Sequence, residues 1–222
     1  MVDRPRVKIC GLTRNEDARL ADTLGADFLG VVLSSGFGRS IRPGAAASVL
    51  AGTSAKSVAV VVDETATRTA ELARHIDASV IQLHGSEDLQ VVRELRALGD
   101  WAVWKAVRAA SITDLTRVVG SLGSAIDGLV VEGWSEGVVG GGGVRLGLDP
   151  VDVRAHLPLG LDFVLAGGLT AESVGEAVVR FRPDVVDVSS GLEKSLGVKE
   201  PELLRLFLDS VGSVPSTVPP HD

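Results

Sequence analysis

The chain has 222 residues, 45% of them hydrophobic and only 4% aromatic, so valine, alanine and leucine must build its core. Its net charge of −7 argues against a general nucleic-acid binder, and we expect neither a signal peptide nor a membrane span, because no apolar run is long enough. The single cysteine, Cys10, excludes an intramolecular disulfide framework and is typical of a reducing compartment, so we expect a cytoplasmic protein.

Strand-like apolar runs and helix-like segments alternate through the first half of the chain. The runs 7–10, 27–33, 57–63 and 79–85 predict strands. A capping box from Thr13 to Glu16 predicts a helix that Gly25 closes. Helices are also predicted over 43–50 and 64–76, and a further one is capped by Ser86 and ended by Gly99.

The alternation continues through the second half. Strands are predicted over 101–108, 126–134, 162–168 and 185–191, and helices over 111–122, from Asp149, around Val174–Phe181 and over 200–211. Eight βα units predict a single-domain (β/α)8 TIM barrel over 1–211, followed by a disordered tail over 212–222. A doubly wound open sheet shares the local pattern. The count of eight and the lack of a dinucleotide fingerprint after the first strand favour the barrel.

Polar and small residues gather at the carboxyl ends of the predicted strands, where barrels carry their active sites. They are Cys10, Arg39, His84, Glu132, Gly167, Gly168, Ser190 and Gly191. The two glycines after the seventh strand, with Ser190 and Gly191 after the eighth, predict a phosphate site built from backbone N–H groups and a hydroxyl. Ordinary turn chemistry is the alternative. The glycine-rich segment 137–147 fits either a mobile loop over a ligand or a plain linker.

Cys10 and Glu132 are the candidates for proton transfer, from opposite sides of the barrel mouth. Cys10 is either a reactive thiol, with Lys8 on the same strand face as its helper, or a small buried hydrophobe. Arg39 either pairs with a substrate carboxylate or is an ordinary surface arginine. His84 is either a site residue or a loop histidine whose partners lie within the protein. With one cysteine and four dispersed histidines, no metal site is expected.

Taken together, the motifs "KICGLT", "GADFLGVVL", "IQLHG", "LAGGLT" and "VDVSSGLE…GVKEPE" occur in the order seen in the phosphoribosylanthranilate isomerases. The chain resembles that family from about residue 7 to residue 208. The resemblance implies a (β/α)8 barrel that converts N-(5-phosphoribosyl)anthranilate to 1-(2-carboxyphenylamino)-1-deoxyribulose 5-phosphate in tryptophan biosynthesis, an Amadori rearrangement that needs no cofactor or metal.

The resemblance also implies roles for single residues. Cys10 would be the general base that removes the C2 proton, and Glu132 would be the general acid that protonates the furanose oxygen. Arg39 would hold the anthranilate carboxylate, Asp187 and His84 would contact the substrate, and the loops after strands seven and eight would hold the phosphate. The chain departs from the family twice, with Glu132 in place of an aspartate and a run of glycines where a Thr or Ser is more common. We expect the Glu132 pKa to be raised by burial, so that some of the acid stays protonated.

Two other functions stay open on the sequence alone. One is another phosphosugar isomerase or epimerase on the same barrel, and the other is a non-catalytic sensor of phosphoribosyl ligands. The expected partner in each case is a small phosphoribosyl molecule, with no nucleic acid or membrane, and the protein is expected to be a monomer or a homodimer.

Overall fold

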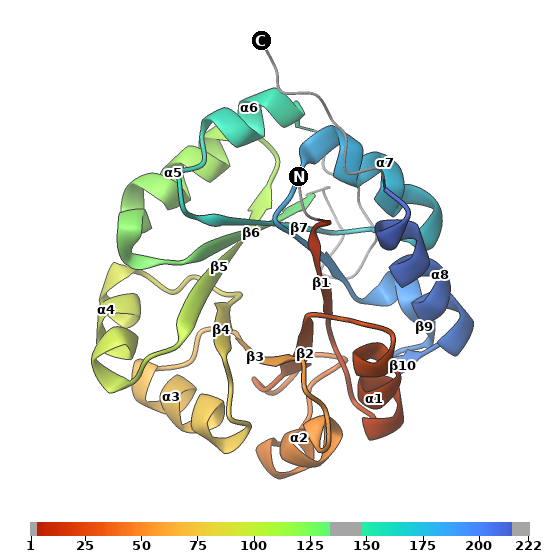
Figure 1. Ribbon diagram of the computed structural model, residues 1–222. Coiled ribbons are helices and arrows are strands. Elements are labelled where there is room, and N and C mark those ends of the chain that lie inside the picture. Colours follow the sequence, from red (N-terminus) through yellow and green to blue (C-terminus); the bar gives the residue numbers. More distant parts are fainter. Residues whose placement is uncertain (1–3, 134–147, 215–222) are drawn as a thin grey trace.

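Eight parallel strands close into a ring in a computed structural model, which describes residues 4–133 and 148–214 (Figure 1). Each strand pairs with its neighbours in chain order, and β8 pairs with β1 to complete the barrel. The strands are β1 (Arg6–Ile9), β2 (Phe28–Val32), β3 (Lys56–Val61), β4 (Val80–Leu83), β5 (Ala102–Ala109), β6 (Gly128–Gly133), β7 (Asp162–Ala166) and β8 (Val185–Val188). The predicted TIM barrel is therefore confirmed, and the open sheet is excluded.

Helices form an outer ring around the strands, as Figure 1 shows. They are α1 (Asn15–Thr23), α2 (Pro43–Leu50), α3 (Ala66–His75), α4 (Leu89–Leu98), α5 (Ile112–Leu122), α6 (Pro150–Ala155), α7 (Ala171–Phe181) and α8 (Pro201–Gly212). None of the helices within the described residues is long and apolar enough to cross a membrane.

Two predicted helix starts are wrong, because both capping side chains bond elsewhere. Thr13 does not cap α1, since its Oγ1 donates to the carbonyl of Gly197 at 2.5 Å, and the N-cap position falls on Arg14. Ser86 does not cap α4, since its N–H and hydroxyl both bond to Asp63. The cap of α4 is Asp88, whose carboxylate accepts from two backbone N–H groups of the first turn.

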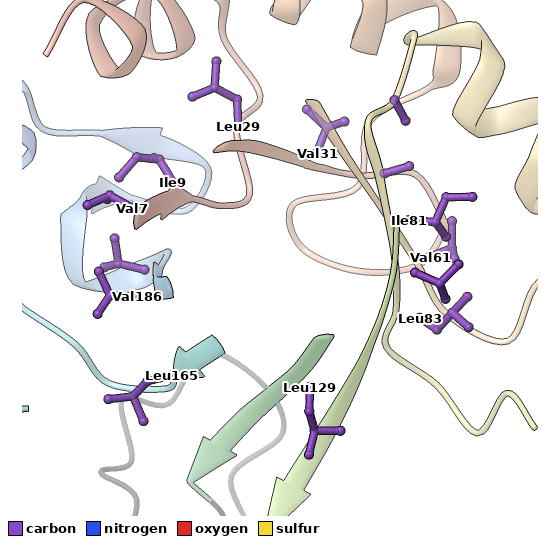
Figure 2. Close-up of a cluster of buried hydrophobic side chains, with 14 of the residues drawn as sticks. Val7, Ile9, Leu29, Val31, Val61, Ile81, Leu83, Leu129, Leu165 and Val186 are labelled. Carbon is purple, nitrogen blue, oxygen red and sulfur yellow. The ribbon is translucent and has the colours of Figure 1, made fainter. Parts of the chain in front are cut away.

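The main core lies between the strands and the helices. Figure 2 shows the outward-facing aliphatic side chains of the strands in this layer, among them Val7, Ile9, Leu29, Ile81 and Leu129, all of them fully buried. Alternate residues of each strand point to opposite faces. The sequence therefore places valine, leucine and isoleucine on the helix side and leaves the other face of each strand to line the barrel.

A second apolar cluster fills the barrel interior. It consists of Phe28, Val58, Val60, Val80, Trp104, Val130, Val164, Ala166 and Val185. Trp104 packs edge-on against Phe28, with ring centroids 5.0 Å apart. Gly128 makes room for this indole, because a Cβ there would lie 2.5 Å from a Trp104 carbon. The interior is thus closed by side chains, and a ligand can bind only at the mouth.

A short antiparallel hairpin between β8 and α8 was not predicted. After the 3-10 turn η2 (Ser190–Leu192), β9 (Glu193–Ser195) pairs with β10 (Val198–Lys199). Gly197 forms the turn with φ near 75°, a backbone conformation that suits glycine. The hairpin carries Glu193 and Lys199 to the mouth of the barrel. The proposed covering loop over 137–147 and residues 215–222 of the predicted tail lie outside the described residues.

Candidate active site

Cys10 lies directly after β1 at the barrel mouth, above a buried ion pair. The Nζ of Lys8 is fully buried and lies 2.7 Å from the Oδ2 of Asp187 on β8. A Cβ at Gly30 would lie 3.0 Å from the Cys10 sulfur and 3.2 Å from the Lys8 stem, so both side chains point into the barrel beside that glycine. The expected placement of Lys8 on the face of Cys10 is confirmed.

The charges around Cys10 act on its pKa in opposite directions. Burial raises the pKa of the thiol and the Asp187 carboxylate adds to that effect, whereas Lys8 and Lys199 favour the thiolate. The net effect is a raised pKa. For Lys8, burial lowers the pKa, but Asp187 and Cys10 more than offset it, so Lys8 stays charged and faces the sulfur as a counter-ion.

Glu132 stands at the end of β6 with two basic groups beside it. Its Oε2 lies 3.5 Å from the Nε2 of His84 on the β4 side and 3.8 Å from the Nε of Arg108 on β5. Burial raises the pKa of the carboxyl, but the hydrogen bond from His84 and the charge of Arg108 outweigh burial. The expectation of a raised Glu132 pKa is therefore wrong, because the pKa lies below its ordinary value.

Arg39 is already paired inside the protein. Its Nε and Nη2 each donate to a carboxylate oxygen of Glu193 at 2.7 Å, a two-pronged contact that fixes the guanidinium plane. Lys199, fully buried, donates to the same carboxylate at 3.0 Å and to the Ser189 carbonyl at 3.0 Å. Two cations thus share one anion, and the cluster keeps a surplus positive charge next to the barrel mouth.

Gly11 allows Arg39 to lie close to Cys10. A Cβ at Gly11 would overlap the Arg39 stem and would lie 2.8 Å from the Ser189 hydroxyl, so no larger residue fits there without a shift. Its φ of 69° also favours glycine. Gly11, the residue after the candidate base, therefore leaves the space that the Arg39 side chain occupies.

The two candidate phosphate loops lie against each other. A Cβ at Gly191 would overlap the carbonyl oxygen of Leu169, so the turn η2 packs directly on the loop after β7. Gly167 and Gly168 have φ values of 89° and 65°, which aim their backbone groups in directions other residues rarely adopt. The cleft beside these two glycines extends along α7 to Arg180, and Cys10 and Glu132 are not among its described lining residues.

The sequence-predicted residues thus form three groups around the mouth. Cys10 lies with Asp187 and Arg39, Glu132 with His84, and the glycines of the last two loops with Ser190. Sequence reasoning missed Arg108, although it ends a predicted strand. Glu193 and Lys199 were not predicted either, although both lie in the motif "VDVSSGLE…GVKEPE". Where the structure describes the chain, no three or more Asp, Glu, His or Cys residues are grouped to hold a metal.

Known proteins resemble the chain over nearly its full length. A family model described as "PRAI: N-(5'phosphoribosyl)anthranilate (PRA) isomerase" matches residues 7–210. The N-(5'-phosphoribosyl)anthranilate isomerase of Chromohalobacter salexigens is 38% identical over 212 residues, which are 95% of each chain.

Solved structures agree with this match. The dimeric phosphoribosylanthranilate isomerase of Thermotoga maritima, crystallised as generated monomers, is 28% identical with a TM-score of 0.80, over 94% of this chain and 99% of that one. A phosphoribosyl anthranilate isomerase bound to reduced 1-(o-carboxyphenylamino)-1-deoxyribulose 5-phosphate is 27% identical with a TM-score of 0.79, over 94% and 98%.

Proposed function

The chain belongs to the N-(5′-phosphoribosyl)anthranilate isomerase family and catalyses that isomerisation in tryptophan biosynthesis, and from this premise we propose which of its residues carry the reaction. The substrate has an anthranilate carboxylate at one end, a phosphate at the other and a ribose between them. The reaction moves protons at the ribose, so it requires one acid, one base and two anion-binding groups.

Cys10 acts as the base and Glu132 as the acid. Glu132 delivers its proton to the furanose oxygen, which opens the ring and leaves a protonated Schiff base at C1. The Cys10 thiolate then removes the proton from C2, and the electron pair of that C–H bond neutralises the Schiff base as the enol amine forms. Tautomerisation gives the ketose. No electrons leave the substrate, so the step needs no oxidant.

The observation that carries these roles is the placement of Cys10 and Glu132 on different sides of the barrel mouth. Lys8, in its pair with Asp187, supplies a fixed positive charge beside the sulfur, which stabilises a thiolate when it forms. Glu132 lies on β6, and the strands β7 and β8 separate it from β1 around the ring. A ribose held across the mouth therefore meets a thiol on one side and a carboxyl on the other.

The pH dependence of kcat/KM tests this pair, because it reports pKa values of the free enzyme. The active form needs Glu132 protonated and Cys10 ionised. Since the Glu132 pKa is lowered and the Cys10 pKa raised, both forms are minor at neutral pH. As pH rises between the two pKa values, the fraction of protonated Glu132 decreases by the same factor by which the fraction of Cys10 thiolate increases. The product of the two fractions is therefore constant in this range.

We therefore expect a broad plateau in kcat/KM through neutrality. The rate should fall below the ordinary pKa of a glutamate, as thiolate continues to be lost, and above the ordinary pKa of a cysteine, as protonated Glu132 continues to be lost. Steady-state rates, followed by the loss of substrate fluorescence, give the profile. A narrow bell centred near pH 7 would contradict the assignment of the pair.

Arg39 holds the anthranilate carboxylate, and Asp187 contacts the ribose. The surplus positive charge of the cluster that Arg39 forms with Glu193 and Lys199 supports the first role, since a carboxylate would neutralise it. The Oδ1 of Asp187 is buried without a hydrogen-bond partner among the described residues, which supports the second. A ribose hydroxyl is a suitable donor for that oxygen.

The backbone of Gly167, Gly168, Ser190 and Gly191 holds the phosphate. Gly168→Asp should weaken binding of the reduced product analogue by at least about tenfold, because a carboxylate would face the phosphate in a partly desolvated site. Gly168→Asn is the matched control, since it has the same size and the same strain at φ near 65° without the charge. Calorimetric titration measures both. Equal affinities of the two variants would place the phosphate elsewhere.

The thiol also bears on where the protein works. A base that must remain a free thiol requires a reducing compartment, which supports the cytoplasm. A homodimer is supported by the relative from Thermotoga maritima, which is described as dimeric.

A further inference from the structure

Both ring nitrogens of His84 have partners inside the protein. Nδ1 lies 2.9 Å from the amide nitrogen of Gln82, and Nε2 lies 3.5 Å from the Oε2 of Glu132. Gln82 is an inward residue of β4 and is only 1% exposed. A ring engaged at both ends has little capacity left for a substrate, which points to a role within the protein.

The Gln82 amide and the Glu132 contact together indicate which nitrogen of a neutral His84 ring carries the proton. Its amide N–H₂ can only donate, so Nδ1 of His84 accepts and the ring proton lies on Nε2, directed toward Glu132. The reverse amide orientation would put the proton on Nδ1. A neutral ring would then turn the lone pair of Nε2 toward a carboxylate oxygen, and that contact is repulsive.

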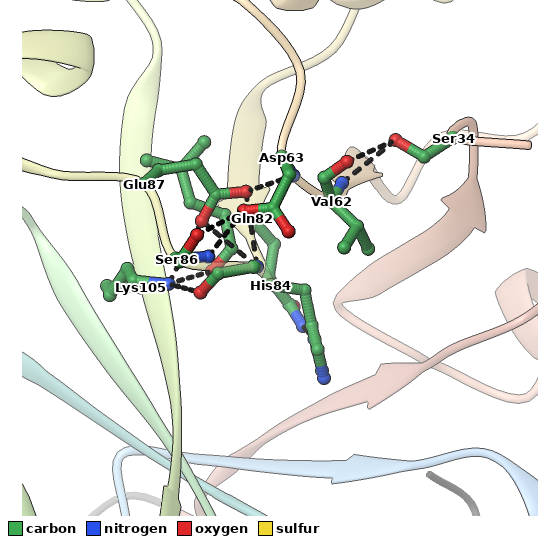
Figure 3. Close-up of polar contacts among 10 residues, drawn as sticks. Ser34, Val62, Asp63, Gln82, His84, Ser86, Glu87 and Lys105 are labelled. Atoms are coloured by element: carbon green, nitrogen blue, oxygen red, sulfur yellow. Dashed lines mark hydrogen bonds and ion pairs between the residues drawn. The ribbon is translucent and has the colours of Figure 1, made fainter. Parts of the chain in front are cut away.

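The backbone around His84 is held by a second, buried network (Figure 3). The Glu87 carboxylate accepts from the Gly85 N–H at 3.0 Å and from the Asp63 N–H at 2.8 Å. Lys105 donates to that carboxylate at 3.0 Å and to the Gly85 carbonyl at 2.5 Å. Removing either Glu87 or Lys105 would leave an unpaired buried charge, and the bonds of both fix the Gly85 backbone directly after His84.

We propose that His84 is a positioning residue, which Gln82 orients and which holds the carboxyl of Glu132 at the barrel mouth. The inference rests on the proposed role of Glu132 as the acid, and it assigns His84 an action through Glu132 rather than on the substrate. A glutamate side chain has three rotatable bonds, and an unanchored carboxyl would sample positions far from the ring oxygen. The His84 contact selects one of them.

Other charged groups also face Glu132 and remain in place when His84 is replaced. Arg108 approaches from β5, and Lys8 acts on it from β1. Both favour the ionised carboxylate, whereas burial opposes it. A change seen on replacing His84 alone is therefore assigned to the lost contact, and not to the whole basic environment.

The test compares His84→Phe with His84→Gln. Phenylalanine removes the donor, whereas the amide N–H₂ of a glutamine reaches about the position of Nε2 and can keep the contact without an imidazole. By ¹³C NMR, His84→Phe should raise the Glu132 pKa by about one unit or more, whereas His84→Gln should leave it close to the parent value.

Gln82→Met removes the group that fixes the tautomer of the His84 ring. The Glu132 pKa in this variant should lie between those of His84→Gln and His84→Phe.

Kinetics complete the test. In His84→Phe we expect kcat to fall about tenfold, because displacement of the carboxyl outweighs the larger protonated fraction that the raised Glu132 pKa gives. The affinity for the reduced product analogue should change little, since geometry and not binding is disturbed. An unchanged Glu132 titration in His84→Phe would overturn the inference, and a loss of analogue affinity alone would make His84 a substrate ligand. A shifted titration with parental kcat would retain the contact and overturn instead the acid role of Glu132.

Discussion

Replacing Cys10 with alanine should lower kcat by about 100-fold or more, the range found for general acid–base groups. Alanine cannot take the C2 proton, and the neighbouring Lys8 cannot replace the thiolate. Lys8 is committed to Asp187, and its raised pKa keeps it protonated, so it can donate but not accept. The affinity for the reduced product analogue should change little, because the thiol does not hold an anionic group. Steady-state and single-turnover rates measure the loss.

Cys10→Ser separates chemistry from packing. A hydroxyl has nearly the volume of a thiol but is far less acidic, so Cys10→Ser should be impaired almost as severely as Cys10→Ala. Both variants should melt close to the parent temperature, since Lys8 keeps its partner and the side chain is small. An active Cys10→Ala enzyme would show that the thiol is a packing residue and that the base is another group.

The alternation of apolar runs and helical segments was enough to predict the barrel. Valine-rich runs such as that of β3 leave few options other than a buried parallel strand, and eight of them close a ring. The helix starts were harder, because they depend on contacts across the chain. Thr13 bonds to a residue 184 positions away, so no local pattern could show that it does not cap α1.

The candidate site was predicted only in part, because some of its contacts also join residues that are far apart in the chain. The position of Cys10 beside Lys8 follows from the period of a strand. Arg39 bonds to Glu193 across 154 residues, through a hairpin that has too few residues to give a signal of its own. The direction of the Glu132 pKa shift also depends on distant groups, because burial alone would have raised it and His84 with Arg108 lowers it.

Replacing Glu132 with glutamine should lower kcat by about 10²- to 10⁴-fold. The amide keeps the shape and can still accept a hydrogen bond from His84, but it has no acidic proton to give to the ring oxygen. Steady-state kinetics, with analogue affinity as the check on the fold of the site, measure the effect. If Glu132→Gln turns over like the parent, the acid is a different group.

Asp127 is the other carboxyl of the same segment, and its surroundings exclude it as that group. It precedes β6, at the amino end of the barrel, where its Oδ2 accepts from the Val103 N–H at 2.7 Å and from Arg96 at 2.5 Å. Asp127→Asn should therefore act on stability and leave kcat near the parent value. This makes it the control for a general loss of charge along this segment.

Glu132→Asp then measures what the longer side chain contributes. An aspartate keeps the acid but draws the carboxyl back by about one methylene, so the contact of 3.5 Å with His84 can no longer be made without a backbone shift. We expect partial activity, between those of the parent and Glu132→Gln, because the acid survives while its position does not. The acid limb of kcat/KM should also move to higher pH, since the aspartate loses the hydrogen bond that lowers the pKa of Glu132. A parental kcat in Glu132→Asp would mean that the length of the acid side chain at this position does not limit the rate.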